Sequence, residues 1–148
     1  MVTHDEIADG REDFLRGYVE AMLWVNTFVE RPGEEDVESE DVRYWYQSPG
    51  RWWEDTPVNV EDAETFWNCF AYVILSLDYG KRGTEWPSAE LAGHDFALTR
   101  NGHGVGFWDR GLGRIGDMLT SECEPYGEHN VIIEVDNDDN VVATYNEN

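Results

Sequence analysis

Most side chains that could do chemistry lie in one stretch, AGHDFALTRNGHGVGFWDRGLG, which covers residues 92–113. It holds two His, two Asp, two Arg and one Asn among six Gly. We call its central part, residues 93–111, the glycine-rich corner. Its candidate ligand-binding residues are His94, Asp95, Arg100, Asn101, His103, Trp108, Asp109 and Arg110.

A metal ion is the first ligand that these residue types suit. His94, Asp95, His103 and Asp109 offer the nitrogen and oxygen ligands that zinc or another divalent ion uses. Their spacing matches no established metal motif, because the sequence has no HExxH, no CxxC pair and no EF-hand loop. The residue types alone therefore leave a metal site open.

An anion or a nucleotide is the second candidate. Glycine amides and the start of the following helix can bind phosphate, and Arg100, Arg110 and Arg114 would add positive charge. The sequence GHGVG follows a predicted helix, whereas dinucleotide-binding and P-loop fingerprints follow a strand. The match to a nucleotide motif is therefore weak.

A hydrolase is the third candidate. His94 or His103 could act as a general base, with Asp95 or Asp109 orienting its ring. No serine elbow or evident cysteine nucleophile accompanies such a pair. Enzymatic activity is therefore uncertain, and we favour a protein without it.

A structural corner is the fourth interpretation, and we prefer it. Glycine supplies the left-handed backbone of tight turns, while Asn101 and the two His rings could satisfy backbone groups. Asp109 and Arg110 would pair with Arg100 or Arg114. We accordingly predict no cofactor, and a metal ion or nucleotide remains the alternative.

Helical periodicity predicts the elements that position this corner. Apolar residues from Phe14 to Val29 recur at spacings of three and four, so we expect a first helix that ends at the RPG of residues 31–33. A second, most apolar helix follows Asn59 as its cap and should be central. A third runs from an N-cap at Ser88 to Gly102, and a short fourth covers residues 112–123.

Two β-branched runs joined at residues 136–140 predict a C-terminal hairpin. The expected fold class is therefore α+β, mostly α, with about four helices packed on one core and a C-terminal β-hairpin in a single domain, residues 1–148. Cys69 and Cys123 both fall at apolar helical positions and are expected to be buried free thiols.

Charge is distributed unevenly along the chain, whose formal net charge is −22. Residues 1–42 hold 13 acids and three bases, and residues 117–148 hold nine acids and no base. Residues 78–116, which contain the glycine-rich corner, hold five of each. Such a field repels nucleic acids and anionic membranes and attracts basic partners.

Acidic and aromatic segments supply a second set of candidates. The segment EEDVESED, residues 34–41, should form a mobile loop within residues 31–42, and the hairpin turn is also acidic. These carboxylates either imitate the phosphates of DNA or form a well-solvated surface, and nearby Trp rings either anchor a partner or cap the core. The candidate partner-binding residues are Glu34, Glu35, Asp36, Glu38, Asp41, Trp45, Trp52, Trp53, Asp136, Asp138 and Asp139.

The glycine-rich corner closely resembles the shared segment of a family of small, uncharacterised proteins from tailed bacteriophages. That segment reads much like HDFWLTRNGHGAGFWDRG, followed by a helix that ends near Tyr-Gly. Here the matching residues are 94–96, 98–104, 106–111 and 126–127, and the departures are Ala97 and Val105. The specific match covers about 35 residues.

The resemblance implies a viral accessory protein made inside a bacterial host. Together with the charge, it leads us to expect a protein of the host cytoplasm that binds a basic host protein, possibly one that handles nucleic acid. We expect no direct nucleic-acid binding, because the net charge of −22 repels DNA and RNA. We expect no membrane association, because no apolar run approaches a membrane span and the start MVTHDEIADG does not resemble a signal peptide.

Overall fold

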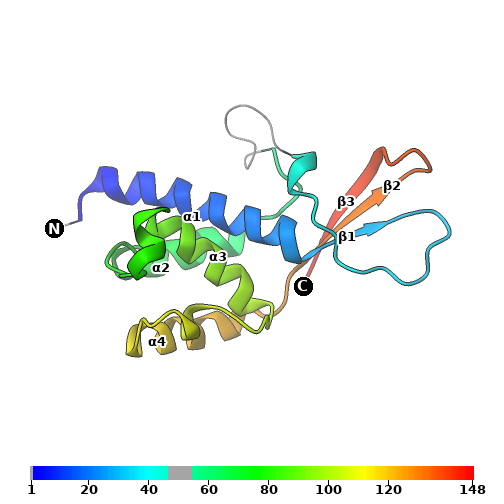
Figure 1. The fold of residues 1–148 in the computed structure, drawn as a ribbon. Helices are drawn as coiled ribbons and strands as arrows, with labels where there is room; N and C mark the ends of the chain where they lie inside the picture. The colour runs from blue at the N-terminus through cyan, green and yellow to red at the C-terminus, as the bar shows by residue number, and fades with distance from the viewer. Residues whose placement is uncertain (1, 47–54) are drawn as a thin grey trace.

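Four α-helices and a three-stranded sheet make up the described part of the computed structural model, residues 2–46 and 55–148. The helices gather on one side and the sheet extends from them (Figure 1). This confirms an α+β fold that is mostly α. The main elements are α1 (His4–Val25), β1 (Thr27–Glu30), α2 (Glu61–Leu75), α3 (Ser88–Arg100), α4 (Arg114–Cys123), β2 (Asn130–Val135) and β3 (Val141–Glu147).

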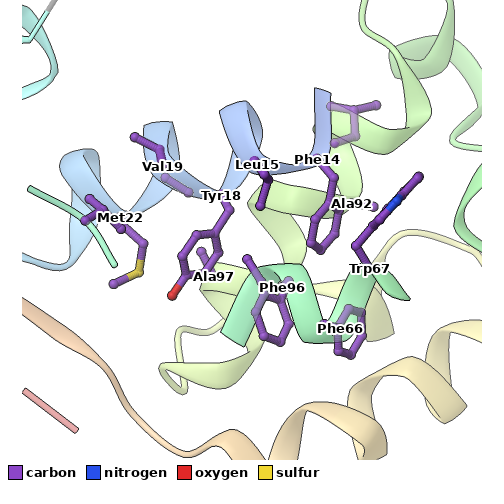
Figure 2. Packing of buried hydrophobic residues seen from close by; sticks show 14 of the residues in the cluster. Phe14, Leu15, Tyr18, Val19, Met22, Phe66, Trp67, Ala92, Phe96 and Ala97 are labelled. Carbon is purple, nitrogen blue, oxygen red and sulfur yellow. The ribbon is translucent and has the colours of Figure 1, made fainter. Parts of the chain in front are cut away.

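Aromatic rings from α1, α2 and α3 form the centre of the core. Figure 2 shows Phe14 and Tyr18 of α1 beside Phe66 of α2 and Phe96 of α3. The Phe66 and Phe96 rings stack with centroids 4.4 Å apart, and Tyr18 lies 5.4 Å from Phe96. Stacked and tilted aromatic pairs add specific geometry to the burial of a large apolar area.

Two glycines let α1 and α3 approach until their backbones touch. A Cβ at Gly17 would meet the carbonyl oxygen of Glu90, and a Cβ at Gly93 would meet that of Phe14. Gly17 therefore serves the helix contact, although its intrinsic helix propensity is poor. The small residues Ala92 and Ala97, both fully buried, extend the same contact along α3.

The prediction that the first helix continues to Val29 was wrong. The helix ends at Val25, and Thr27–Glu30 form strand β1, which pairs in parallel with β2. The Thr27 hydroxyl donates to the carbonyl of Met22 and so ends the helix. Both β-branched residues of the strand, Thr27 and Val29, are buried in it.

The predicted hairpin is confirmed and extended by β1, so that β2 is the central strand. The Asp136 carboxylate accepts from the backbone N–H groups of Asp138 and Asn140, which closes the turn. Asp139 there has a φ of 60°, a conformation that Asp and Asn tolerate better than most residues.

The helix α3, and not α2, is the most buried. Ten of its 13 residues are buried, against five of 15 in α2. Tyr72 of α2 is 64% exposed, and Cys69 is exposed, which corrects its predicted burial, whereas Cys123 is buried as predicted. Helix α2 has more apolar surface than α1 and α3 cover. Sequence periodicity shows which faces are apolar but not how much of them neighbouring helices cover.

Two helix starts also differ from the prediction. Ser88 is the first residue of α3 and not its cap; its hydroxyl donates to the carbonyl of Leu77. Asn59 lies one residue before the cap position of α2, but its side chain still accepts from the N–H of Glu61. Residues Arg43–Trp45 form a short 3-10 helix, η1.

The variant Gly93→Ala should lower the free energy of unfolding by about 3 kcal/mol, because the new methyl group meets backbone that cannot rotate away. Urea denaturation followed by circular dichroism measures this change. Gly83→Ala is the control, since a Cβ there lies 3.5 Å from its nearest neighbour, an ordinary contact. Equal denaturation midpoints for the two variants would contradict the role given to Gly93.

Candidate functional site

Arg100 joins four parts of the chain at the end of α3. Its guanidinium donates to the Tyr18 hydroxyl at 3.1 Å and to the carbonyls of Tyr126 and Gly127 at 3.1 and 2.9 Å. It also forms an ion pair with Asp62 at 2.8 Å, and its side chain has no exposed area. All three nitrogens of Arg100 are therefore engaged within the protein. Of the two partners left open for Asp109 and Arg110, Arg100 is thus wrong, and Asp109 lies 3.8 Å from Arg110 itself.

The buried Asp95 of α3 pairs with the partly exposed Arg110 from the loop before α4. The Arg110 Nε lies 3.1 Å from an oxygen of Asp95, and the Tyr79 hydroxyl donates to the other oxygen at 3.0 Å. Burial raises the pKa of Asp95, while Arg110 and then Tyr79 oppose the rise. Both oxygens are satisfied, so the carboxylate is held in place and has no free role as a ligand.

Two asparagines and two histidines connect the helices to the sheet. His103 Nε2 lies 2.7 Å from the Asn26 side-chain oxygen, and the Asn26 amide donates to the carbonyl of His129 at 2.8 Å. The Asn101 oxygen accepts from the N–H of His129 at 2.7 Å. Asn26 and His129 were missed by the sequence analysis, because nothing in their local sequence shows that they meet residues so distant in the chain.

The remaining predicted residues of the corner are dispersed. Asp109 accepts from the N–H of Gly106 at 2.9 Å, and Trp108 is 51% exposed on the surface. His94 faces away from this network, with its Nε2 3.8 Å from an oxygen of Glu20. This contact with His94 is the main cause that lowers the pKa of Glu20. His94 and His103 therefore do not share one site.

A hollow of about 350 Å³ lies beside the corner, and its lining includes Arg100, His103, Trp108 and Cys123. Burial raises the pKa of the Cys123 thiol to about 12, so this group is protonated near neutral pH. Two carboxylates, Glu124 and Glu128, also line the hollow and would repel a phosphate group. Within residues 2–46 and 55–148, no three His, Cys, Asp or Glu side chains are grouped to hold a metal ion.

The two acidic segments meet at the far end of the sheet. Arg31 pairs with Glu40 at 2.8 Å and with Asp139 at 3.1 Å, which ties the chain after β1 to the hairpin turn. We call residues 34–41 and 136–139 together the acidic end; in Figure 1 the hairpin turn lies beyond the strands, and the chain after β1 loops out and returns along β1. A hollow of about 490 Å³ lies there, lined by Arg31, Glu40, Tyr44, Trp45 and Asp139 among others.

The predicted partner-binding residues divide into two groups. Asp41 pairs with Arg43 at 2.9 Å, Asp136 closes the hairpin turn, and Asp139 pairs with Arg31. The second group is Glu34, Glu35, Asp36, Glu38 and Asp138, whose side chains are exposed. Trp45 is half-buried against the core beside the 62%-exposed Tyr44, while Trp52 and Trp53 lie outside the described residues.

The segment 31–42 has several fixed points in the structure. Ser39 bridges Phe28 of β1, and the N–H of Glu40 donates to the carbonyl of Thr27 at 2.8 Å. Val42 is fully buried. The mobility predicted for this segment stays a prediction. These contacts restrict it to residues 32–38.

Comparison with protein-family models, curated proteins and solved structures found no match for this chain. In the described part of the chain, no helix combines the length and apolar character needed to cross a membrane.

Replacing Arg100 by Met should lower the free energy of unfolding by about 3 kcal/mol, since it leaves Asp62 and two carbonyls without their partner. Thermal and urea denaturation measure the loss. Arg114→Met, at an exposed position, removes the same charge and should change stability little. If both variants unfold alike, the Arg100 network does not hold the helices together.

Nucleotides and divalent metals should leave the melting temperature unchanged, because the corner already uses its Arg, His and Asp groups internally. A thermal-shift screen with Mg-ATP, Mg-GTP and Zn²⁺ tests this, since a ligand at 100 times its Kd adds about 2.7 kcal/mol. A shift that disappears in His103→Ala and persists in Arg114→Ala would establish a ligand site at the corner.

Proposed function

We propose that the protein is a phage accessory protein that binds a basic host protein through its acidic end. The resemblance of the glycine-rich corner to the phage family supports a viral origin, and the net charge of −22 supports a basic partner. The partner class that fits best handles nucleic acid, because its own surface is built to bind closely spaced negative charges.

One observation carries the proposal: Arg31 holds two acidic segments together although they are about 100 residues apart. Its pairs with Glu40 and Asp139 bring residues 34–41 beside the hairpin turn. The grouped carboxylates then resemble the charge array of a nucleic-acid backbone. Like charges repel, so their convergence costs free energy in the isolated protein and is recovered when a basic surface binds.

Aromatic rings at the edge of this surface would supply contacts that do not depend on charge. Tyr44 is 62% exposed and meets Trp45 edge-on, with ring centroids 5.8 Å apart. Both residues line the hollow that Arg31 and Asp139 also line. Tyr and Trp are frequent among the residues that dominate binding energy at protein interfaces.

The proposed mechanism is electrostatic capture in the host cytoplasm, without catalysis and without direct binding to nucleic acid. The free protein repels DNA and RNA at long range by its charge. The neutral glycine-rich corner takes no part in binding and fixes the scaffold. The acidic end competes with nucleic acid for the basic partner.

The variant Glu34→Gln/Glu35→Gln/Asp36→Asn/Glu38→Gln should lose capture of basic proteins, because it removes four exposed charges from the acidic end. Immobilised protein is incubated with the DNA-binding fraction of a bacterial lysate, and bound proteins are eluted with salt or with duplex DNA. We expect elution between about 0.05 and 0.5 M salt, since screening weakens exposed charge pairs.

A matched control removes four exposed acids near α4, by Asp117→Asn/Glu122→Gln/Glu124→Gln/Glu128→Gln. This control has the same net charge as the first variant and should retain capture. Equal loss in both would assign binding to net charge and not to the acidic end. Capture that resists both salt and duplex DNA would rule out competition with nucleic acid.

A further inference from the structure

A small pocket beside α1 is lined by aromatic and charged side chains that have no role in the proposed function. It lies between α1, the 3-10 helix η2 (Gly80–Thr84) with the residues after it, and the first turns of α3, and its volume is about 200 Å³. We call it the tryptophan pocket. Its lining includes Glu20, Trp24, Arg82, Trp86, Glu90 and His94.

Two tryptophans from distant parts of the chain meet in this pocket and remain half exposed. Trp24 of α1 is 45% exposed, and Trp86, just before α3, is 50% exposed. An indole left in water forgoes the large stabilisation that burial of an aromatic ring gives. Its negative π face is also the best side-chain surface for a cation.

Glu90 places a carboxylate in the same pocket without a partner. The residue is only 6% exposed, and among the described residues no hydrogen bond or ion pair reaches its side chain. Burial raises the pKa of Glu90, and the nearby Glu20 raises it further, while Arg16 and His94 act in the opposite direction. The Glu90 oxygens are not among the fully buried side-chain atoms without a partner, so the carboxylate opens into the pocket, where a bound cation would pair with it.

Two residues of the pocket lining, Trp24 and Glu20, already contact a cationic side chain of the protein itself. The Arg43 guanidinium lies over the Trp24 ring, 5.0 Å from its centroid, and 3.6 Å from an oxygen of Glu20. Arg43 does not belong to the pocket lining, so the pocket itself stays open. This contact shows that the Trp24 ring and the Glu20 carboxylate stabilise a positive group here.

We propose that the tryptophan pocket binds one organic cation, an alkylammonium or guanidinium head group. The head group would lie between the Trp24 and Trp86 rings and face the Glu90 carboxylate. The volume of about 200 Å³ is below the roughly 300–1,000 Å³ of pockets for drug-sized ligands, which suits a single head group. The pocket belongs to no metal-binding group of His, Cys, Asp or Glu in the described chain, which favours an organic cation.

Arg82 is the one arginine in the lining and lies on the exposed segment η2. It would repel an incoming cation, so the variant Arg82→Ala should strengthen binding about two- to threefold. An anionic ligand would show the opposite change. This variant therefore distinguishes the sign of the ligand's charge.

The test is an NMR titration of the indole N–H signals with choline, with 3,3-dimethylbutan-1-ol as its uncharged isostere. Choline should shift the signals of Trp24 and Trp86, and the alcohol should bind at least about fivefold more weakly, because it lacks the attraction between a cation and the ring face. Argininamide and a lysine-containing peptide are titrated in the same way. Tighter binding of the peptide than of choline identifies a protein side chain as the source of the cation, and the reverse identifies a free amine.

Variants locate the site. Trp86→Leu and Glu90→Gln should each weaken choline binding about fivefold or more. Trp108→Leu removes a ring of equal exposure, 51%, at the glycine-rich corner and should change nothing. Near-ultraviolet circular dichroism and melting temperature verify that each variant is folded.

Equal binding of choline and its uncharged isostere would overturn the proposal, as would no binding of choline by the folded wild-type protein. Wild-type affinity in folded Glu90→Gln would do the same. The acidic-end variant, in which Glu34, Glu35, Asp36 and Glu38 are neutralised, should bind choline normally. The pocket and the proposed host-protein interaction are therefore tested separately, and either can fail without the other.

Discussion

The backbone contact between α1 and α3 is the constraint on which the other features depend. It exists because Gly17 and Gly93 have no side chain, so each helix can touch the backbone of the other. On one side of this crossing, Tyr18 and Phe96 meet in the core, and Arg100 at the end of α3 can reach the Tyr18 hydroxyl. The tryptophan pocket lies on the other side. One close contact between two helices therefore sets the geometry of both the structural network and the proposed cation site.

The position of the sheet follows from polar contacts and not from apolar packing alone. Asn26, directly after α1, binds the carbonyl of His129 just before β2, and Asn101, directly after α3, binds the N–H of the same residue. Buried amide groups need partners with defined geometry, so these bonds fix where β1 and β2 start relative to each other. The hairpin turn then lies beside residues 31–42, where Arg31 can reach Asp139. The glycine-rich corner therefore affects the acidic end only indirectly, because Asn101 helps to fix where β2 starts.

Sequence periodicity predicted the number of helices and the hairpin, because each depends on local patterns and turn residues. It missed β1, since four residues between a helix and a loop acquire strand geometry only by pairing with β2. Periodicity also does not show that Gly17 contacts the backbone of Glu90 in α3. In the glycine-rich corner it identified polar residues that form internal hydrogen bonds and ion pairs, but it did not identify their partners. Arg100 pairs with Asp62 and not with Asp109, and only the packing of α2 decides between them.

The placement of the basic residues bears on the proposal that the acidic surface binds a partner. A solvated surface is most stable when like charges are spread apart, since repulsion grows as they approach. Here one of only ten basic residues, Arg31, is used to draw two acidic segments together. Arg100 pairs with Asp62 and Arg110 pairs with Asp95, so neither of these arginines lies at the acidic end. Glu34, Glu35, Asp36 and Glu38 are thus left exposed and close together in sequence at the acidic end, an arrangement that the proposed basic partner would stabilise.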